Sequence, residues 1–222
     1  MLIAEQRRIS RDFKTILKSM VCLFREPTNL DYIYNLEDEL RYTQASLLAV
    51  EWLKAQPEVL LLIQERYIAP YPNIEVLLQY PEDSLGYAYA SYIKKSSFDP
   101  GFYRQIQVQD DVSYVLLRSR QTHDIWHVVT GFKTDGLGEL GLKAFELAQT
   151  RRNLAVFLVG GGLLSILVKS PDVLPDLLEQ IAVGYTMGSK AKPLLAQKWE
   201  EHWDKPLLEW RAELGIDSDI LN

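Results

Sequence analysis

Two of the three histidines in this chain lie four residues apart, at His123 and His127, with Asp124 between them. On an α-helix that advances about 100° per residue, His127 lies about 40° from His123 and Asp124 about 100° from it, so the three residues share one sector. Imidazole and carboxylate groups suit Zn²⁺, with Fe²⁺, Mn²⁺ and Mg²⁺ as alternatives, and the lack of a thiolate disfavours a closed structural zinc site. The spacing predicts a metal-binding face. The alternative is satisfied core or surface histidines beside a solvated aspartate.

A second helix is predicted to complete the ligand set. Glycine, here Gly131, is typical of the position where a helix ends. Thr134 or Asp135 is typical of the capping residue at the start of the next helix. Glu139 follows about one turn later, so a tight reversal of the chain brings its carboxylate back toward the histidines. We therefore predict a helix pair over residues 110–150 that binds one divalent ion. Its four ligands are also the candidate catalytic residues: His123, Asp124, His127 and Glu139.

A metal ion with an open position acts as a Lewis acid, which polarises a substrate carboxylate or phenolate oxygen or activates water. A basic residue is then expected nearby to hold an anionic substrate. Arg120 lies at about 60° on the same helical wheel and can bind a carboxylate or phosphate in bidentate fashion. A salt bridge to Asp124 or Glu139 is its alternative role. Lys190 and Lys192 are predicted to add a second contact from a loop.

The least polar segment of the chain follows the helix pair. Residues 153–168 carry no charge and contain the triplet Gly160, Gly161 and Gly162. The run is shorter than the about 20 residues of a membrane-spanning helix, and no strand precedes the triplet, so it is not a phosphate-binding loop. Close helix packing in the core is the default interpretation. The functional alternative is a substrate-binding slot for a long apolar tail, left by the missing side chains.

The rest of the chain predicts one all-α fold. Apolar residues recur at helical spacing, prolines separate the helical segments, and no alternating pattern of β-branched residues appears. With 222 residues, of which 47% are hydrophobic, the chain has enough apolar side chains for a core. We expect a single compact multi-helix domain over residues 1–222.

Composition and the N-terminal segment limit the partners and the cellular location that we expect for this protein. A net charge of −6 argues against nucleic acid as a partner, and the lone Cys22 excludes an internal disulfide. Residues 1–25 alternate apolar and basic positions at helical spacing. Such an amphipathic helix can lie on an anionic membrane surface or pack against the core with a solvated face. The N-terminus shows neither a signal-peptide nor a transit-peptide pattern, so we expect a cytoplasmic location.

The spacing of the four candidate ligands resembles the HDxxH-x11-E signature of the coenzyme Q biosynthesis protein 4 family. This motif is the specific part of the resemblance, which runs from about residue 36 to 216. Mitochondrial members of the family carry a targeting extension, and because this sequence shows no such pattern we expect a bacterial-type homologue. Other segments are similar to the family pattern and support it: Arg118 and Arg120 ahead of His123, residues 84–90 (SLGYAYA), Trp199 with Glu200, and residues 210–216 (WRAELGI).

This resemblance implies a lipid-quinone biosynthesis protein that acts on a polyprenylated 4-hydroxybenzoate-type head group. It implies removal of the ring C1 carboxyl group by a metal-dependent carboxy-lyase, with bound zinc or another divalent ion. It also implies a quinone biosynthesis complex at a membrane, and thus a peripheral contact at the inner membrane surface. We further expect a homodimer. The segment KAK at 190–192 is poorer in arginine than the family tends to be, so a quinone other than ubiquinone is an alternative product.

Three other functions match parts of this pattern. A phosphohydrolase of the HD type needs a histidine upstream of His123, which is the first in the chain. A zinc protease needs glutamate as general base where Asp124 stands. A non-catalytic isoprenoid-binding scaffold, in which the metal fixes a phosphate head group, remains the main alternative to an enzyme.

Overall fold

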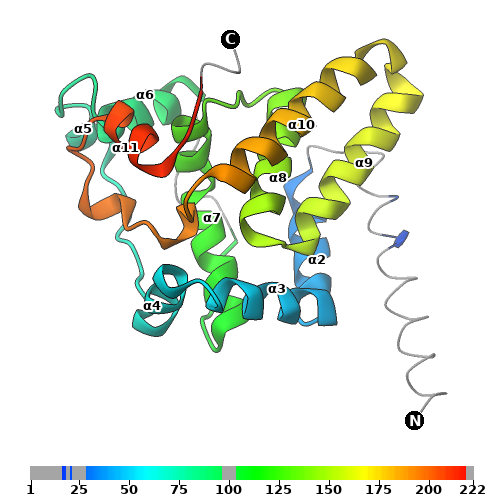
Figure 1. The fold of residues 1–222 in the computed structure, drawn as a ribbon, viewed down its shortest axis with the longest axis horizontal. Coiled ribbons are helices and arrows are strands. Elements are labelled where there is room, and N and C mark those ends of the chain that lie inside the picture. The colour runs from blue at the N-terminus through cyan, green and yellow to red at the C-terminus, as the bar shows by residue number, and fades with distance from the viewer. Residues whose placement is uncertain (1–16, 19–20, 22–28, 97–103, 219–222) are drawn as a thin grey trace.

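The structure, a computed structural model, describes residues 17–18, 21, 29–96 and 104–218. Within these ranges the chain forms one compact domain of α-helices and short 3₁₀ helices without a β-strand, which confirms the predicted all-α fold (Figure 1). The predicted amphipathic helix over residues 1–25 lies almost wholly outside the described residues. Among the described helices, none is both long enough and apolar enough to cross a membrane.

Short segments connect most of the described α-helices. These helices are α2 (Leu30–Leu40), α3 (Gln44–Lys54), α4 (Pro57–Glu65), α5 (Ile74–Leu77), α6 (Leu85–Ser96), α7 (Asp111–Thr130), α8 (Gly136–Thr150), α9 (Asn153–Lys169), α10 (Leu174–Lys190) and α11 (Leu207–Leu214). Three 3₁₀ helices connect or follow them, at Pro171–Val173, Leu194–Ala196 and Trp199–Glu201.

Helix α7 runs through the middle of the molecule, and α3, α4, α6, α8 and α11 pack around it (Figure 1). It begins at a reciprocal cap, in which the Asp110 carboxylate accepts from the Ser113 backbone N–H and the Ser113 hydroxyl accepts from the Asp110 N–H. It ends at Gly131, whose φ of 87° is the left-handed conformation that glycine adopts without strain. Tyr114 and Trp126 of α7 are buried in the main hydrophobic core. The helix with both histidines is therefore fixed at each end and along its length.

Helices α8 and α10 approach closely through glycines. A Cβ atom on Gly184 would lie 2.1 Å from the Gly141 carbonyl oxygen, and one on Gly188 would lie 2.6 Å from the Phe145 carbonyl oxygen. Because Gly184 and Gly188 are one helical turn apart, they lie on the same face of α10. The lack of side chains on this face lets α8 pack closely against it. The close-packing role that we assigned to residues 160–162 thus belongs mainly to these glycines.

A buried ion pair joins α7 to the C-terminal part of the chain. The Arg118 guanidinium donates to both carboxylate oxygens of Glu200, at 2.7 and 2.9 Å, and to the Gln197 carbonyl oxygen at 2.7 Å. The two side chains are 0% and 4% exposed. Charges this deeply buried are stable only while paired, so Arg118 and Glu200 support the fold rather than a ligand.

Candidate metal centre

Three of the four predicted ligands converge between α7 and α8. Nitrogen and oxygen atoms of His123, His127 and Glu139 all lie within 4.8 Å of one another, a grouping that could hold a metal ion. The His127 Nε2 atom is 3.1 Å from Glu139 Oε1, and the His123 Nε2 atom is 3.7 Å from Glu139 Oε2. The two imidazole rings are 4.9 Å apart between centroids. Two imidazoles and one carboxylate thus face a common point.

The turn between α7 and α8 sets the position of Glu139. After Gly131 the chain reverses, and the Asp135 carboxylate caps α8 by accepting from the Gly138 N–H at 2.8 Å. A side chain at Gly138 would clash with the Lys133 backbone, since its Cβ would lie 2.2 Å from the carbonyl oxygen. This turn therefore requires glycine three residues into α8. Glu139 follows directly and faces the histidines of α7.

The hydrogen bonds of His127 leave one ring nitrogen available to a cation. Its Nδ1 atom lies 2.9 Å from the Phe132 carbonyl oxygen, which can only accept, so Nδ1 carries the proton. In the neutral ring Nε2 then has a lone pair. This atom is buried and makes no hydrogen bond within the described residues, although Glu139 Oε1 is close by. A lone pair this close to a carboxylate oxygen is unfavourable unless a proton or a metal ion lies between them, so the site can take up a cation.

His123 is oriented by two residues that the sequence analysis missed. Its Nδ1 atom lies 2.9 Å from Glu146 Oε1, and the Lys143 ammonium lies 2.8 Å from the same oxygen. A carboxylate behind an imidazole is the usual arrangement around metal-bound histidines, because it fixes the tautomer and directs Nε2 toward the metal. Glu139, Lys143 and Glu146 follow a spacing of four and three residues, so one face of the second helix already carried this signal.

The pKa values of these groups show that the site attracts positive charge. Burial and the Lys143 ammonium oppose protonation of His123, but hydrogen bonds to Glu139 and Glu146 outweigh them and raise its pKa to about 9. Burial opposes ionisation of Glu139, yet the neighbouring imidazoles, His123 first and then His127, hold its pKa below the usual range. A divalent ion that binds here therefore displaces a proton from His123 at neutral pH.

Asp124 is not among the residues whose ligand atoms converge, so the predicted set of four is met by three within the described chain. Arg120, predicted as a substrate contact on the same sector, makes other contacts in the structure. Its Nε and Nη2 atoms bind Glu37 of α2, and its Nη1 donates to the Arg104 carbonyl oxygen at 2.6 Å. A long side chain can reach far from its position on the helical wheel, so the wheel angle did not fix where the guanidinium lies.

Lys190 and Lys192 also lie away from the candidate ligands. The Gln149 side chain, near the C-terminal end of α8, donates to the Gly188 and Ala191 carbonyl oxygens. The segment with both lysines thus borders the end of α8 opposite Glu139, about 15 Å along the helix at 1.5 Å per residue. Their contact with a substrate stays a prediction, and the segment that carries them lies at the opposite end of α8 from Glu139. Lys143 is the cation that the structure places beside the ligands.

The glycine triplet of α9 is divided between two environments. A Cβ atom on Gly162 would lie 2.4 Å from Leu140, the residue after Glu139, so here α9 passes close to α8. Gly160 and Gly161 face open space. Four large apolar residues of α9 are each at least 52% exposed. Together they define the outer face of α9: Val156, Gly160, Gly161, Leu164, Leu167 and Val168.

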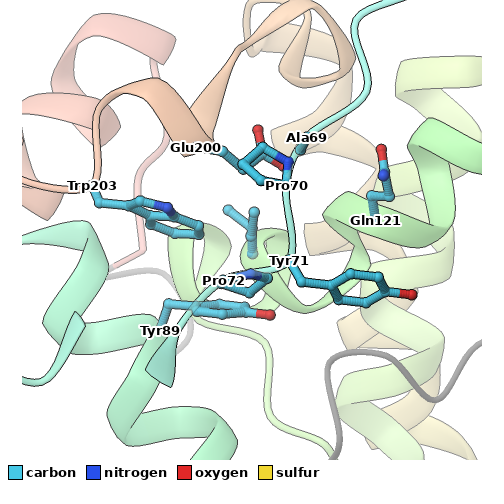
Figure 2. Close-up of a pocket in the computed structure, with 9 residues that line it drawn as sticks. Ala69, Pro70, Tyr71, Pro72, Tyr89, Gln121, Glu200 and Trp203 are labelled. Atoms are coloured by element: carbon cyan, nitrogen blue, oxygen red, sulfur yellow. The ribbon is translucent and has the colours of Figure 1, made fainter. Parts of the chain in front are cut away.

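A separate pocket lies on the other side of α7. Figure 2 shows Tyr89 and Trp203 on one side of it and Gln121 of α7 on the other. The Tyr89 and Trp203 rings are stacked with their centroids 5.1 Å apart. On the helical wheel Gln121 points about 160° away from His123. The pocket encloses about 340 Å³ including its open mouth, and its lining contains none of the candidate ligands. It is therefore distinct from the metal centre.

The sequence matches a protein family over nearly its whole length, including α7 and α8. Residues 12–219 match the model of a family described as "Coenzyme Q (ubiquinone) biosynthesis protein Coq4". The chain belongs to this family. The Coq4 match spans both helices of the metal centre and nearly all of the described chain.

Individual Coq4 relatives agree in sequence and in fold. A mitochondrial ubiquinone biosynthesis protein COQ4 homolog from Aedes aegypti is 27% identical over 89% of this chain and 68% of the relative. The homolog from Rattus norvegicus is 30% identical over 74% of this chain and 63% of the relative. A crystal structure from Nostoc punctiforme, named as a candidate ubiquinone biosynthesis protein, superposes with a TM-score of 0.84 at 38% identity, covering 92% of this chain and 98% of that one. The last match fits the expectation of a bacterial-type Coq4 protein.

Proposed function

We propose that this Coq4 protein binds the head group of a prenylated quinone precursor at a divalent metal ion held by His123, His127 and Glu139. The observation that carries the proposal is the convergence of the His123, His127 and Glu139 ligand atoms, in which the buried His127 Nε2 lies 3.1 Å from a Glu139 oxygen. The family establishes a link to coenzyme Q biosynthesis. The donor set of two imidazoles and a carboxylate suits Zn²⁺ first, with Fe²⁺, Mn²⁺ and Mg²⁺ as alternatives.

The surrounding residues of the chain have separable roles in this proposal. When bound, the metal supplies a Lewis acid for an anionic oxygen of the head group. The Phe132 carbonyl and Glu146 hold the two imidazoles in the tautomers that present Nε2. Lys143 offsets the negative charge of Glu146. The site thus keeps a charge balance that tolerates an anionic ligand.

For the reaction we propose loss of the C1 carboxyl group from a prenylated 4-hydroxybenzoate. The bond between the ring carbon and the carboxyl carbon breaks, CO₂ leaves, and the ring carbon takes up a proton. The alternative is a scaffold that binds the same lipid without turnover. Either role is compatible with a homodimer and with a quinone biosynthesis complex as partners.

One experiment separates these functions. The full-length protein, loaded with Zn²⁺ or Fe²⁺, is incubated with a 3-polyprenyl-4-hydroxybenzoate labelled in its carboxyl carbon, and a chelator-treated sample serves as control. Metal-dependent release of labelled CO₂ supports the enzyme. Retention of intact lipid in a stoichiometric complex supports the scaffold. If the protein neither binds nor converts this lipid in either metal state, the proposed function is wrong.

The outer face of α9 offers a place for the apolar part of such a ligand, and we propose that it contacts the membrane. The face carries no charge over residues 153–168, whereas Arg151 and Lys169 are exposed at its two ends. An apolar helix face between cations is typical of helices that lie in the surface of an anionic bilayer. At Gly162 the same helix adjoins Leu140, next to the ligand Glu139. A lipid on this face would therefore lie close to the helix that carries Glu139.

We expect the double variant Leu164→Glu with Leu167→Glu to bind anionic vesicles at least ~10-fold more weakly than the parent, because two carboxylates on one apolar face oppose burial in the headgroup region. The matched control is Leu61→Glu with Leu208→Glu, since these residues of α4 and α11 are 66% and 73% exposed. Co-sedimentation with vesicles measures both. Equal loss in the two double variants would show that the effect is not specific to α9.

A further inference from the structure

The pocket on the far side of α7 from the metal centre has the features of a small-ligand site. It encloses about 340 Å³ including its open mouth, at the lower end of the range for such sites, which suits a single ring rather than a long chain. The loop before α5, helices α6 and α7, and the segment before α11 all contribute to its lining (Figure 2). Because these segments are distant in the sequence, the pocket exists only in the folded protein.

One wall of the pocket is a fixed aromatic surface. Tyr89 of α6 is 4% exposed, and its ring stacks on that of Trp203. The Gly86 N–H donates to the Trp203 carbonyl oxygen at 2.8 Å, and a Cβ atom on Gly86 would lie 2.9 Å from that oxygen, so α6 and the segment before α11 are in close contact. The wall therefore offers a held face against which a flat apolar ring can pack.

Gln121, on the opposite side of the pocket, has a hydrogen-bond acceptor without a partner. Its Oε1 atom is buried and makes no hydrogen bond within the part of the chain that the structure describes. A buried amide oxygen is unfavourable when unpaired, because it has lost its contacts with water. A ligand with an O–H or N–H donor would satisfy it.

The charges at the pocket favour a neutral ligand. Glu200 is the charged residue of the lining, and the buried Arg118 guanidinium already donates to both of its carboxylate oxygens. A cationic ligand would be repelled by Arg118, and an anionic ligand would lie near Glu200 without a cation in the lining to pair with it.

We propose that this pocket binds a neutral ring that carries a hydroxyl group, that is, a phenol. The ring lies against Tyr89 and Trp203, and the hydroxyl donates to Gln121 Oε1. This site needs no metal ion and lies outside the proposed function, so either can fail without the other.

The test compares two probes, p-cresol and 4-methylanisole, which share a ring but differ in that the second has no hydroxyl proton. Both are titrated into full-length, chelator-treated protein, and ligand-observed NMR measures the two dissociation constants. The parent is expected to bind p-cresol about 10-fold more tightly, because only p-cresol donates to Gln121 Oε1. Gln121→Met preserves the volume but removes the acceptor, so the ratio of the two constants is expected to fall to about 1.

Gln180→Met is the matched control, since Gln180 belongs to α10, which contributes no residue to the lining, and it is expected to keep the ratio of the parent. Ala69→Phe locates the site, because a large side chain at this lining residue occupies the space of the ring. It is expected to weaken binding of both probes at least ~10-fold.

Several results would overturn the inference: no saturable binding of p-cresol to the parent, a ratio near that of the parent in Gln121→Met, or unchanged binding in Ala69→Phe. Binding of p-cresol that appears only in metal-loaded protein would also overturn it. That last result would place the phenol at the metal centre and leave the proposed function intact.

Discussion

Replacing His123 and His127 together with alanine is expected to weaken divalent-metal binding by at least ~1000-fold, which corresponds to about 4 kcal/mol. Loss of a single residue that only supports a ligand already costs 10–100-fold, and this double variant removes two of three convergent ligands. Glu139 alone cannot hold the ion against water, because one carboxylate leaves most of the coordination shell to solvent. Metal analysis after dialysis against a weak chelator measures the loss.

Two further variants are expected to lose less metal binding than the double histidine variant. Glu146→Gln keeps the volume but removes the charge behind His123 Nδ1, so a loss of about 10–100-fold is expected. His202→Ala alters the third histidine, which is exposed and far from the site along the chain, and is expected to retain full metal content. Full stoichiometry in the double histidine variant would place the metal elsewhere. Circular dichroism of each variant shows whether the helical fold persists.

The largest effect on stability is expected from Arg118→Met. The substitution preserves volume but leaves the Glu200 carboxylate buried without its partner, which costs about 3–5 kcal/mol of unfolding free energy. Denaturant unfolding of metal-free protein isolates this cost from any contribution of metal binding. The control is Lys205→Met, which breaks the more exposed pair with Glu213 and should cost less than about 1 kcal/mol.

A second step tests the cause. In the double variant Arg118→Met with Glu200→Leu no unpaired charge remains, so most of the lost stability should return. If Arg118→Met costs no more than Lys205→Met, the buried pair does not support the fold in the way described. If the double variant is as unstable as Arg118→Met, the loss comes from packing or from the hydrogen bond to Gln197 rather than from the charge.

Local spacing made much of the metal centre predictable. His123 and His127 are one turn apart on one helix, and Gly131 and Asp135 mark the reversal that returns Glu139. These signals depend only on the period and the caps of helices. Glu146 could have been found in the same way, because it continues the polar face of α8.

Contacts between distant segments were not predictable from spacing. The partner of Arg120 is Glu37, 83 residues earlier, and nothing near Arg120 in the sequence indicates that contact. Lys190 and Lys192 were assigned from their charge and the preceding Gly188, but parallel packing of α10 on α8 places them near the far end. Asp124 lies at the edge of the predicted sector, so the helical wheel did not fix the direction of its carboxylate. Only packing between helices settles these positions.

The most direct test of the metal centre is a crystal structure of the full-length protein with data collected on both sides of the Zn²⁺ or Co²⁺ absorption edge. We expect one anomalous peak within coordinating distance of His123 Nε2, His127 Nε2 and a Glu139 oxygen. An anomalous peak bound by other residues, or none between α7 and α8 in metal-loaded crystals, would contradict the central claim.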